Sequence, residues 1–268
     1  MKIAFIGGGN MGTAILSALI DKDLAEPGAI TVSDIMKERL EYLKSTYGVS
    51  ITIDNASAID GKDVILLSVK PQTVPEIMPE LNGKIKAGQL VISIMAGIKI
   101  STIREGLIHK SIVRVMPNMP AQVFEGMSGW TTTPEVTDEQ KELAKSILQA
   151  IGREIYFDDE KYLDMITSVS GSGPAYFFYF VEALTEAGVK IGFTHDVSYE
   201  LVLQTMIGAG KLMRESGTDP AELRKMVTSK GGTTAAALDV LESAGFKDHV
   251  IKALMAAYNR SKELGGEK

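Results

Sequence analysis

One stretch near the start of the chain, Ile3-Ala4-Phe5-Ile6-Gly7-Gly8-Gly9-Asn10-Met11-Gly12, predicts the fold of the first half. A short apolar run leads into a G-x-G-x-x-G pattern, and a helical pattern over residues 13–20 follows. In that context the glycines permit a tight turn, close approach of the backbone to a pyrophosphate, and packing of the helix on the strand. The pyrophosphate would meet unpaired N–H groups at the helix N-terminus. We therefore expect a dinucleotide-binding loop made by Gly7, Gly9, Asn10, Met11 and Gly12, with a turn that binds nothing as the alternative.

Short apolar runs alternate with helical patterns over the rest of residues 1–160. Several runs are rich in Val and Ile and show little polar alternation, which is typical of strands buried on both faces of a parallel sheet. The runs cover residues 30–32, 51–53, 64–69, 90–94, 112–115 and 127–132, and helical patterns include residues 37–43 and 140–148. The predicted fold class is α/β, with a doubly wound, Rossmann-type dinucleotide-binding domain over residues 1–160.

The second half of the chain has a different pattern. From about Leu163 onward no strand pattern is evident, and helical patterns cover residues 196–215, 220–227, 233–242 and 250–263. Asp219-Pro220 is typical of an N-cap followed by proline at the first helical position. We predict an all-helical C-terminal domain over residues 161–268. Its run of five aromatics, residues 176–180, would cover every face of a helix, so we expect it in the core or between subunits.

The composition excludes several functions. The 268 residues are 45% hydrophobic and 23% charged, as in folded globular proteins. A net charge of −6 argues against general nucleic-acid binding. Without Cys there is no disulfide, thiolate metal site or Cys nucleophile, and the isolated His109, His195 and His249 show no metal-ligand spacing. No apolar run could span a bilayer, and the N-terminal one is too short for a signal peptide, so we expect a cytoplasmic protein without a membrane partner.

The second predicted strand ends at Ser33-Asp34, about twenty residues after Gly12. The dinucleotide fingerprint places there an acid that accepts from the ribose 2′-hydroxyl and repels a 2′-phosphate, which favours NADH over NADPH. Ser33, Lys37 and Arg39 are close enough in sequence to accommodate a phosphate instead. The alternative for Asp34 is an N-cap of the next helix, and the two roles are compatible.

Other predicted strands also end in candidate site residues. Ligands of such sheets bind beyond the carboxyl ends of the strands, so we expect these residues to border the cofactor. They are Asn55 after the third strand, Ser68, Val69, Lys70 and Pro71 after the fourth, and Ala96 and Gly97 after the fifth. Met116-Pro117-Asn118-Met119-Pro120 predicts a rigid, site-lining loop after the sixth. For residues 68–71 the alternative is a proline that simply ends a strand.

A small-residue loop in the second half predicts an anion site. Thr228-Ser229-Lys230-Gly231-Gly232-Thr233-Thr234 combines glycines, hydroxyls and a lysine at the start of a helical pattern. N–H groups and hydroxyls at a helix N-terminus bind anions. Because the loop of residues 7–12 is expected to bind the pyrophosphate, a carboxylate is the expected ligand of this second loop. The alternative is a well-capped helix.

The sequence has a predicted dinucleotide site but no Cys, no evident His–Asp relay and no metal-ligand cluster, which suggests simple hydride transfer. In such a reaction the cofactor carries the difficult step and the protein orients it. Reduction of a ketone needs a proton donor for the alkoxide, whereas an iminium nitrogen already carries its proton. A hydroxyl such as Thr167 is sufficient to hold that nitrogen. A carboxylate-binding helix end with only hydroxyls nearby suits a cyclic imino acid.

Over nearly its whole length the chain resembles pyrroline-5-carboxylate reductase. The resemblance rests on residues 5–12, Ser68-Val69-Lys70-Pro71, residues 116–120, Ser170-Gly171-Ser172-Gly173-Pro174-Ala175-Tyr176 and residues 229–234, in this order. It implies reduction of 1-pyrroline-5-carboxylate to L-proline by NAD(P)H, the last step of proline biosynthesis. It also implies a helical domain that interlocks with its twin in a homodimer, sometimes assembled into decamers, with the active site where the domains meet across the dimer.

The resemblance implies a role for each matching residue. Thr167 would be the catalytic hydroxyl near the imine nitrogen, and Asn55 and residues 68–70 would touch the dinucleotide. The carboxylate would be held by Ser229, Gly231, Gly232, Thr233 and Thr234. The sequence departs from the family pattern at two places. Lys230 stands where proline is common, and Asp34-Ile35 replaces a frequent Asn-Arg, which puts the usual NADPH preference in question.

Two rival functions are considered. β-Hydroxyacid dehydrogenases share the two-domain plan but use a lysine where this chain has Phe177, and an aromatic ring cannot transfer a proton. The other rival is a non-catalytic, dinucleotide-sensing protein. Turnover with pyrroline-5-carboxylate and either cofactor discriminates these readings.

Overall fold

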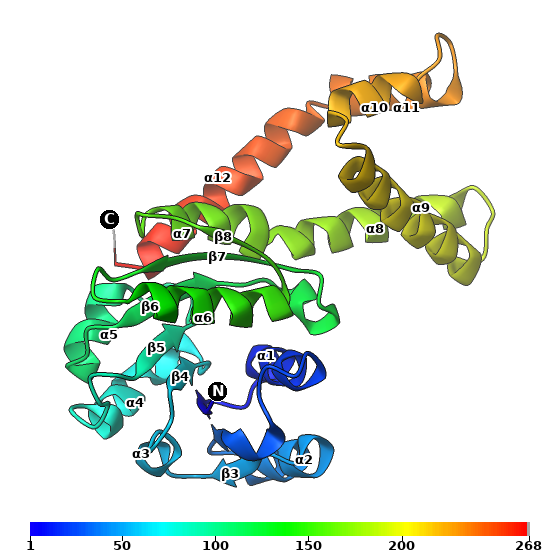
Figure 1. The fold of residues 1–268 in the computed structure, drawn as a ribbon. Helices are drawn as coiled ribbons and strands as arrows, with labels where there is room; N and C mark the ends of the chain where they lie inside the picture. Colours follow the sequence, from blue (N-terminus) through cyan, green and yellow to red (C-terminus); the bar gives the residue numbers. More distant parts are fainter. Residues whose placement is uncertain (267–268) are drawn as a thin grey trace. The chain divides into compact units, whose positions relative to one another are not determined.

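The structure is a computed structural model that describes residues 1–266. It consists of two compact units (Figure 1). The first unit is Met1–Ser172 together with the chain from Ala257 onward, and the second is Gly173–Ala256. The sequence pattern predicts a domain boundary at residues 160/161, whereas the compact units divide at Ser172, because the segment before it packs on the sheet of the first unit.

The first unit is built on one eight-stranded sheet with the order β3-β2-β1-β4-β5-β6-β7-β8. All neighbouring strands are parallel except β6 and β7, which only the short 3₁₀ segment Met119–Val123 connects. The strands are β1 (Ile3–Ile6), β2 (Ile30–Ser33), β3 (Ser50–Thr52), β4 (Val64–Leu67), β5 (Leu90–Ser93), β6 (Ile112–Met116), β7 (Gly126–Thr132) and β8 (Gly152–Tyr156). This confirms the predicted α/β fold class.

Helices cover both faces of the sheet (Figure 1). One face packs α1 (Asn10–Asp21), α2 (Lys37–Tyr47) and α6 (Asp138–Ala150) against Ile3 and Phe5 of β1. The other packs α3 (Asn55–Ala58), α4 (Val74–Leu81) and α5 (Ile100–Leu107) against Ala4 and Ile6. Because successive strand side chains enter opposite cores, the apolar runs show no polar alternation.

The register brings several strands to the same level at their carboxyl ends. Ile6 pairs with Ser33 on one side and with Leu67 on the other. Gly7, Asp34 and Ser68 are the next residues of those three strands, so they leave the sheet at the same edge. The chain runs outward from β1 in both directions, to β2 and to β4, and such a switch point is where ligands bind.

A helical segment just before Ser172 carries Thr167. Helix α7 (Tyr162–Ile166) continues into a π-helical turn, Thr167–Gly171. Buried Asp164 of α7 accepts a hydrogen bond from the Ser261 hydroxyl, with an O···O distance of 2.6 Å. Ser261 belongs to the last turns of α12 (Phe246–Leu264), so this bond holds the end of that helix in the first unit.

The regular secondary structure of the second unit, Gly173–Ala256, is all helical, as predicted. It contains α8 (Gly173–Lys190), α9 (His195–Ser216), α10 (Pro220–Met226), α11 (Thr233–Ser243) and the first part of α12. Asp219 caps α10 by accepting from the Ala221 N–H, which confirms the N-cap prediction. The aromatic run on α8 is not in the core of the chain. Its exposure ranges from 38% at Tyr176 to 72% at Tyr179, because α9 covers only part of the helix.

Candidate functional site

The glycine loop after β1 is held by its neighbours in the sheet. Gly7 has a φ of +100°, which L-residues rarely adopt, and its N–H donates to the carbonyl oxygen of Ser33 at 2.8 Å. The Ser68 hydroxyl donates to the Gly7 carbonyl oxygen at 2.7 Å. The loop is therefore ordered by hydrogen bonds from β2 and from the end of β4.

The glycines of the fingerprint have different surroundings. A Cβ on Gly7 would lie 2.9 Å from the backbone carbonyl of Ser68, and one on Gly12 would lie 2.9 Å from the Ser68 hydroxyl oxygen. A Cβ on Gly9 would have no heavy atom within 4 Å. Gly7 and Gly12 are thus required by close packing within the protein. Gly9 leaves open space where a ligand can approach the backbone.

The N-terminus of α1 fits a pyrophosphate. Gly9 is the N-cap and makes no side-chain capping bond. Within the part of the chain that the structure describes, the N–H groups of Asn10, Met11 and Gly12 have no hydrogen-bond acceptor. Free N–H groups at the positive end of a helix dipole bind phosphate, and the open space at Gly9 allows its approach. The loop therefore fits a dinucleotide.

Asp34 lies against this loop. Its Oδ2 accepts from the Gly8 N–H at 2.7 Å, and its Oδ1 accepts from the Met36 N–H at 2.9 Å. The N-cap of α2 is Met36, so the interpretation of Asp34 as the cap of that helix is wrong. The carboxylate is only partly buried, and each of its oxygens keeps a lone pair for a ribose hydroxyl.

The other predicted cofactor residues lie at the same ends of the strands. Val69 lies beside Gly7, Lys70 is exposed, and Pro71 begins a 3₁₀ turn. Asn55 is buried and donates to the Glu80 carboxylate at 2.6 Å, an interaction that sequence reasoning missed. No local signal connects Asn55 to a residue on α4, since the contact exists only once the helices pack.

The loop after β5 lies against the end of α12. Ala96 is exposed, and Gly97 has a φ of +75°. A Cβ on Gly97 would lie 3.5 Å from the Cβ of Leu264 in α12. The C-terminal helix end therefore packs against the strand end that we predicted to border the cofactor.

Thr167 begins the π-helical turn, a feature that is frequent at functional sites. Its hydroxyl donates to the Leu163 carbonyl oxygen at 2.7 Å. Asn118, from the loop after β6, donates to the Ser170 hydroxyl at 3.1 Å and accepts from the Met127 N–H at 2.8 Å. This loop therefore fixes the π turn at the carboxyl end of β6.

The predicted anion loop lies in the second unit, at the start of α11. Gly231 has a φ of +72°, and Gly232 is the N-cap without a side-chain capping bond. In the described chain, the hydroxyls of Ser229, Thr233 and Thr234 have no hydrogen-bond partner. The interpretation as a well-capped helix is therefore wrong. The unused N–H groups and hydroxyls fit a carboxylate.

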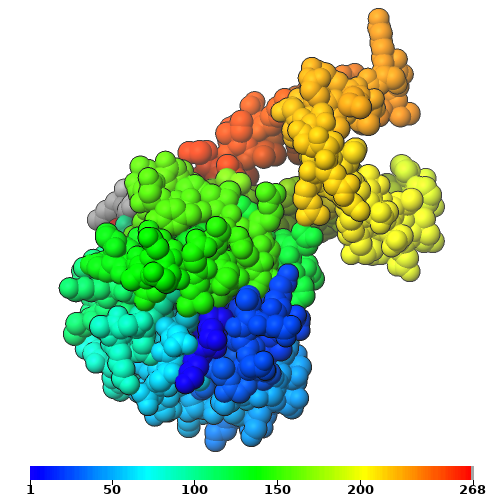
Figure 2. Space-filling view, viewed as in Figure 1, coloured from blue at the N-terminus to red at the C-terminus, as the bar shows by residue number. Residues whose placement is uncertain are grey.

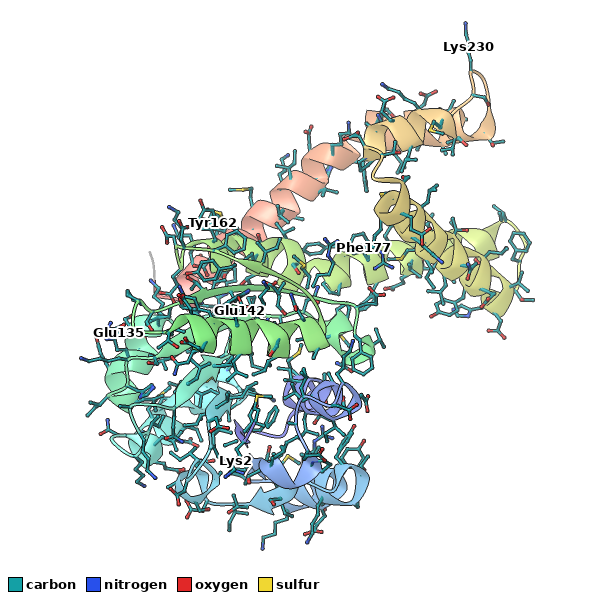
Figure 3. The ribbon with its side chains drawn as sticks, viewed as in Figure 1. Lys2, Glu135, Glu142, Tyr162, Phe177 and Lys230 are labelled. Carbon is teal, nitrogen blue, oxygen red and sulfur yellow. The ribbon has the colours of Figure 1, made fainter. Side chains whose placement is uncertain are left out.

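Lys230 lies at the tip of this loop. The loop between α10 and α11 forms a narrow projection in the space-filling view (Figure 2). Figure 3 shows the Lys230 side chain extending from the tip, away from both helices. In this structure Lys230 therefore adds no direct contact to the N-terminus of α11.

Helices α8 and α9 leave an apolar groove on the second unit. The groove has a volume of about 930 Å³ and is lined by Phe178, Val181, Leu203, Met206 and Ile207, among others. Phe177, labelled in Figure 3, is 59% exposed on the same helix. An exposed apolar surface of this kind is typical of a protein–protein interface.

Within residues 1–266 no group of three His, Asp or Glu side chains could hold a metal ion. No helix in that range is long and apolar enough to cross a membrane.

Both halves of the chain match known protein families, and relatives align with it over nearly its whole length. A model of pyrroline-5-carboxylate reductase dimerisation matches residues 160–264, and a model of F420-dependent NADP oxidoreductases matches residues 2–97. The chain is 40% identical to the pyrroline-5-carboxylate reductase of Synechocystis, over 99% of this chain and 98% of that protein. The enzyme of Pseudomonas aeruginosa is also 40% identical, over 98% and 96% of the two chains.

Solved structures of pyrroline-5-carboxylate reductases also resemble this chain over nearly its full length. The pyrroline-5-carboxylate reductase of Coxiella burnetii is 39% identical with a TM-score of 0.89, over 100% of this chain and 98% of that one. The Plasmodium falciparum enzyme, solved with NADP bound, is 30% identical with a TM-score of 0.89, over 99% and 98%.

Proposed function

Because this chain belongs to the pyrroline-5-carboxylate reductase family, we propose that it reduces 1-pyrroline-5-carboxylate to L-proline with NAD(P)H, using the loops described above. The observation that carries the assignment of residues is the row of free N–H groups at α1, level with the ends of β2 and β4. When bound there, the reduced nicotinamide supplies the hydride that converts the C=N bond of the substrate into C–N.

Thr167 holds the nitrogen of the substrate. Its hydroxyl proton is engaged by the Leu163 carbonyl oxygen, so the lone pairs of the hydroxyl oxygen are available. The hydroxyl therefore accepts from the N–H of the protonated imine, which is the form that takes up hydride. The nitrogen keeps this proton in the product, and no separate general acid is needed. Asn118 keeps the π turn, and with it Thr167, in place through Ser170.

The N-terminus of α11 binds the substrate carboxylate. The hydroxyls of Ser229, Thr233 and Thr234 and the N–H of Gly231 offer donors that nothing in the described chain uses, while the Gly232 N–H donates to the Ser229 carbonyl oxygen at 3.0 Å and closes the turn. Charge-assisted hydrogen bonds from such donors distinguish an imino acid from an uncharged imine.

Residues 7–12 bind the pyrophosphate, bordered by Ser33, Asn55, Ser68–Pro71 and Ala96-Gly97. Asp34 accepts hydrogen bonds from the ribose hydroxyls. Its charge disfavours a 2′-phosphate, so we infer that NADH is at least as good a cofactor as NADPH.

The enzyme assembles through the dimerisation domain, and the exposed aromatic run and the α8–α9 groove support a homodimer, with decamers as a further assembly. We place it in the cytoplasm, which fractionation of cells expressing the tagged protein tests.

The decisive experiment is a steady-state assay with pyrroline-5-carboxylate and each cofactor. We expect turnover with both, and Thr167→Ala should lower kcat with little change in the Kd of the cofactor. Thr167→Ser keeps the hydroxyl and is the matched control. Thr234→Val should raise the KM of the imino acid about tenfold, the value of one charge-assisted hydrogen bond. Absence of turnover with either cofactor would contradict the proposal, as would a Thr167→Ala variant with full kcat.

A further inference from the structure

The backbone of Gly8 is held at both ends by charged side chains. Its N–H donates to Asp34 Oδ2 at 2.7 Å, and its carbonyl oxygen accepts from Arg39 Nε at 2.6 Å. The Thr13 hydroxyl donates to the same carbonyl oxygen at 3.2 Å. Residue 8 precedes the free N–H groups of α1, so these contacts set the direction in which the loop enters the helix.

The Arg39 side chain makes further contacts that fix it beside Gly8. Its Nη2 donates to the Thr13 hydroxyl oxygen at 2.6 Å, and its Cζ lies 5.1 Å from the centre of the Tyr42 ring. The planar guanidinium is thus fixed by the loop on one edge and by an aromatic ring on its face. A move toward a phosphate on the adenosine ribose would break both hydrogen bonds. This argues against the expectation that Arg39 accommodates a 2′-phosphate.

We propose that Arg39 is a positioning residue of the dinucleotide loop. It orients the Gly8–Gly9 peptide, whose carbonyl oxygen it binds, and with it the N–H groups of Asn10–Gly12, toward the pyrophosphate. Since every dinucleotide carries that pyrophosphate, Arg39 supports NADH and NADPH equally. Asp34, which accepts from the Gly8 N–H in the preceding Gly7–Gly8 peptide, is the residue that distinguishes the 2′-hydroxyl from the 2′-phosphate. The inference rests on the dinucleotide site of the proposed function.

The test measures dissociation constants of NAD⁺ and NADP⁺ by isothermal titration calorimetry on the full-length protein without imino acid. Arg39→Lys keeps the positive charge but loses the two-donor fork. It should raise both constants by the same factor, roughly tenfold or more for a lost charged hydrogen bond. Thr13→Val removes the second acceptor of Arg39 without a change of charge, and should raise both constants equally but less. Asp34→Asn should change the ratio of the two constants in favour of NADP⁺.

Two controls separate positioning from other effects. Arg153→Gln removes an exposed charge on β8, far along the sheet from β2, and should leave both constants unchanged. The thermal midpoint of each unliganded variant shows whether the fold is intact. If Arg39→Lys weakens NADP⁺ binding alone, Arg39 is a phosphate ligand and the inference fails. Unchanged constants for a folded Arg39→Lys variant also overturn it. Because no turnover is measured, failure of the proposed reaction is a separate result.

Discussion

Alanine at Gly7 and at Gly9 should damage this protein in different ways, although both glycines belong to one fingerprint. Gly7 has a φ of +100°, which costs an L-residue about 1–2 kcal/mol. The new Cβ would also lie 2.9 Å from the Ser68 backbone, whose N–H is bonded to the Ile6 carbonyl oxygen and cannot easily move. Overpacking of this kind costs about 1–3 kcal/mol. Gly7→Ala should therefore lower the free energy of unfolding by roughly 2–5 kcal/mol.

Gly9→Ala should leave the unliganded protein nearly as stable as the parent. Gly9 has φ −64° and ψ 179°, an extended conformation that alanine adopts freely, and its Cβ would meet nothing within 4 Å. The methyl group would instead occupy the space through which a pyrophosphate approaches α1. We expect a change in unfolding free energy below about 1 kcal/mol, and a dinucleotide Kd at least about tenfold higher.

The assay is urea unfolding of both unliganded variants, followed by the fluorescence of buried Trp130, together with calorimetric titration of the dinucleotide. The two variants control for each other because the substitution is identical. Full cofactor affinity in Gly9→Ala would refute the assignment of the open space to the pyrophosphate. Parental stability in Gly7→Ala would refute the packing argument.

Two further predictions concern buried polar groups. Ser261→Ala leaves the carboxylate of Asp164 without its hydroxyl donor and should destabilise the first unit by about 1–3 kcal/mol; an Asp164→Asn/Ser261→Ala double mutant that shows no coupling would contradict this. Burial lowers the pKa of His109, so between the lowered native pKa and the unfolded value the unfolded chain binds a proton that the native state does not bind. Stability should therefore fall as pH drops below about 6.5, by up to about 1.4 kcal/mol per pH unit, until the lowered native pKa is reached. His109→Gln should flatten this slope in unfolding experiments across that range, and an unchanged slope would assign it to other groups.

Much of the first unit could be predicted from sequence because its signals are local. The uninterrupted apolar strands, the glycine turn and the helical patterns each need only a few neighbouring residues. Edge strand β8 was missed, since Arg153 and Glu154 make it look like surface chain while its pairing with β7 is invisible in sequence. The aromatic run shows the limit of the pattern. Its residues indicate burial, and only the structure shows that this chain alone does not supply it.

Part of the candidate site could likewise be predicted from sequence, and part of it depends on tertiary structure. The sequence alone determined which loops could bind a dinucleotide and a carboxylate, since glycines, hydroxyls and helix starts are local features. Tertiary structure decided what those loops touch. It brought Asp34 to the N–H of Gly8 and Arg39 to the carbonyl oxygen of Gly8, placed the Ser68 hydroxyl on Gly7, and tied Asn118 to the turn that carries Thr167. These contacts join residues distant in sequence, and they form only when strands align in register and helices pack on the sheet.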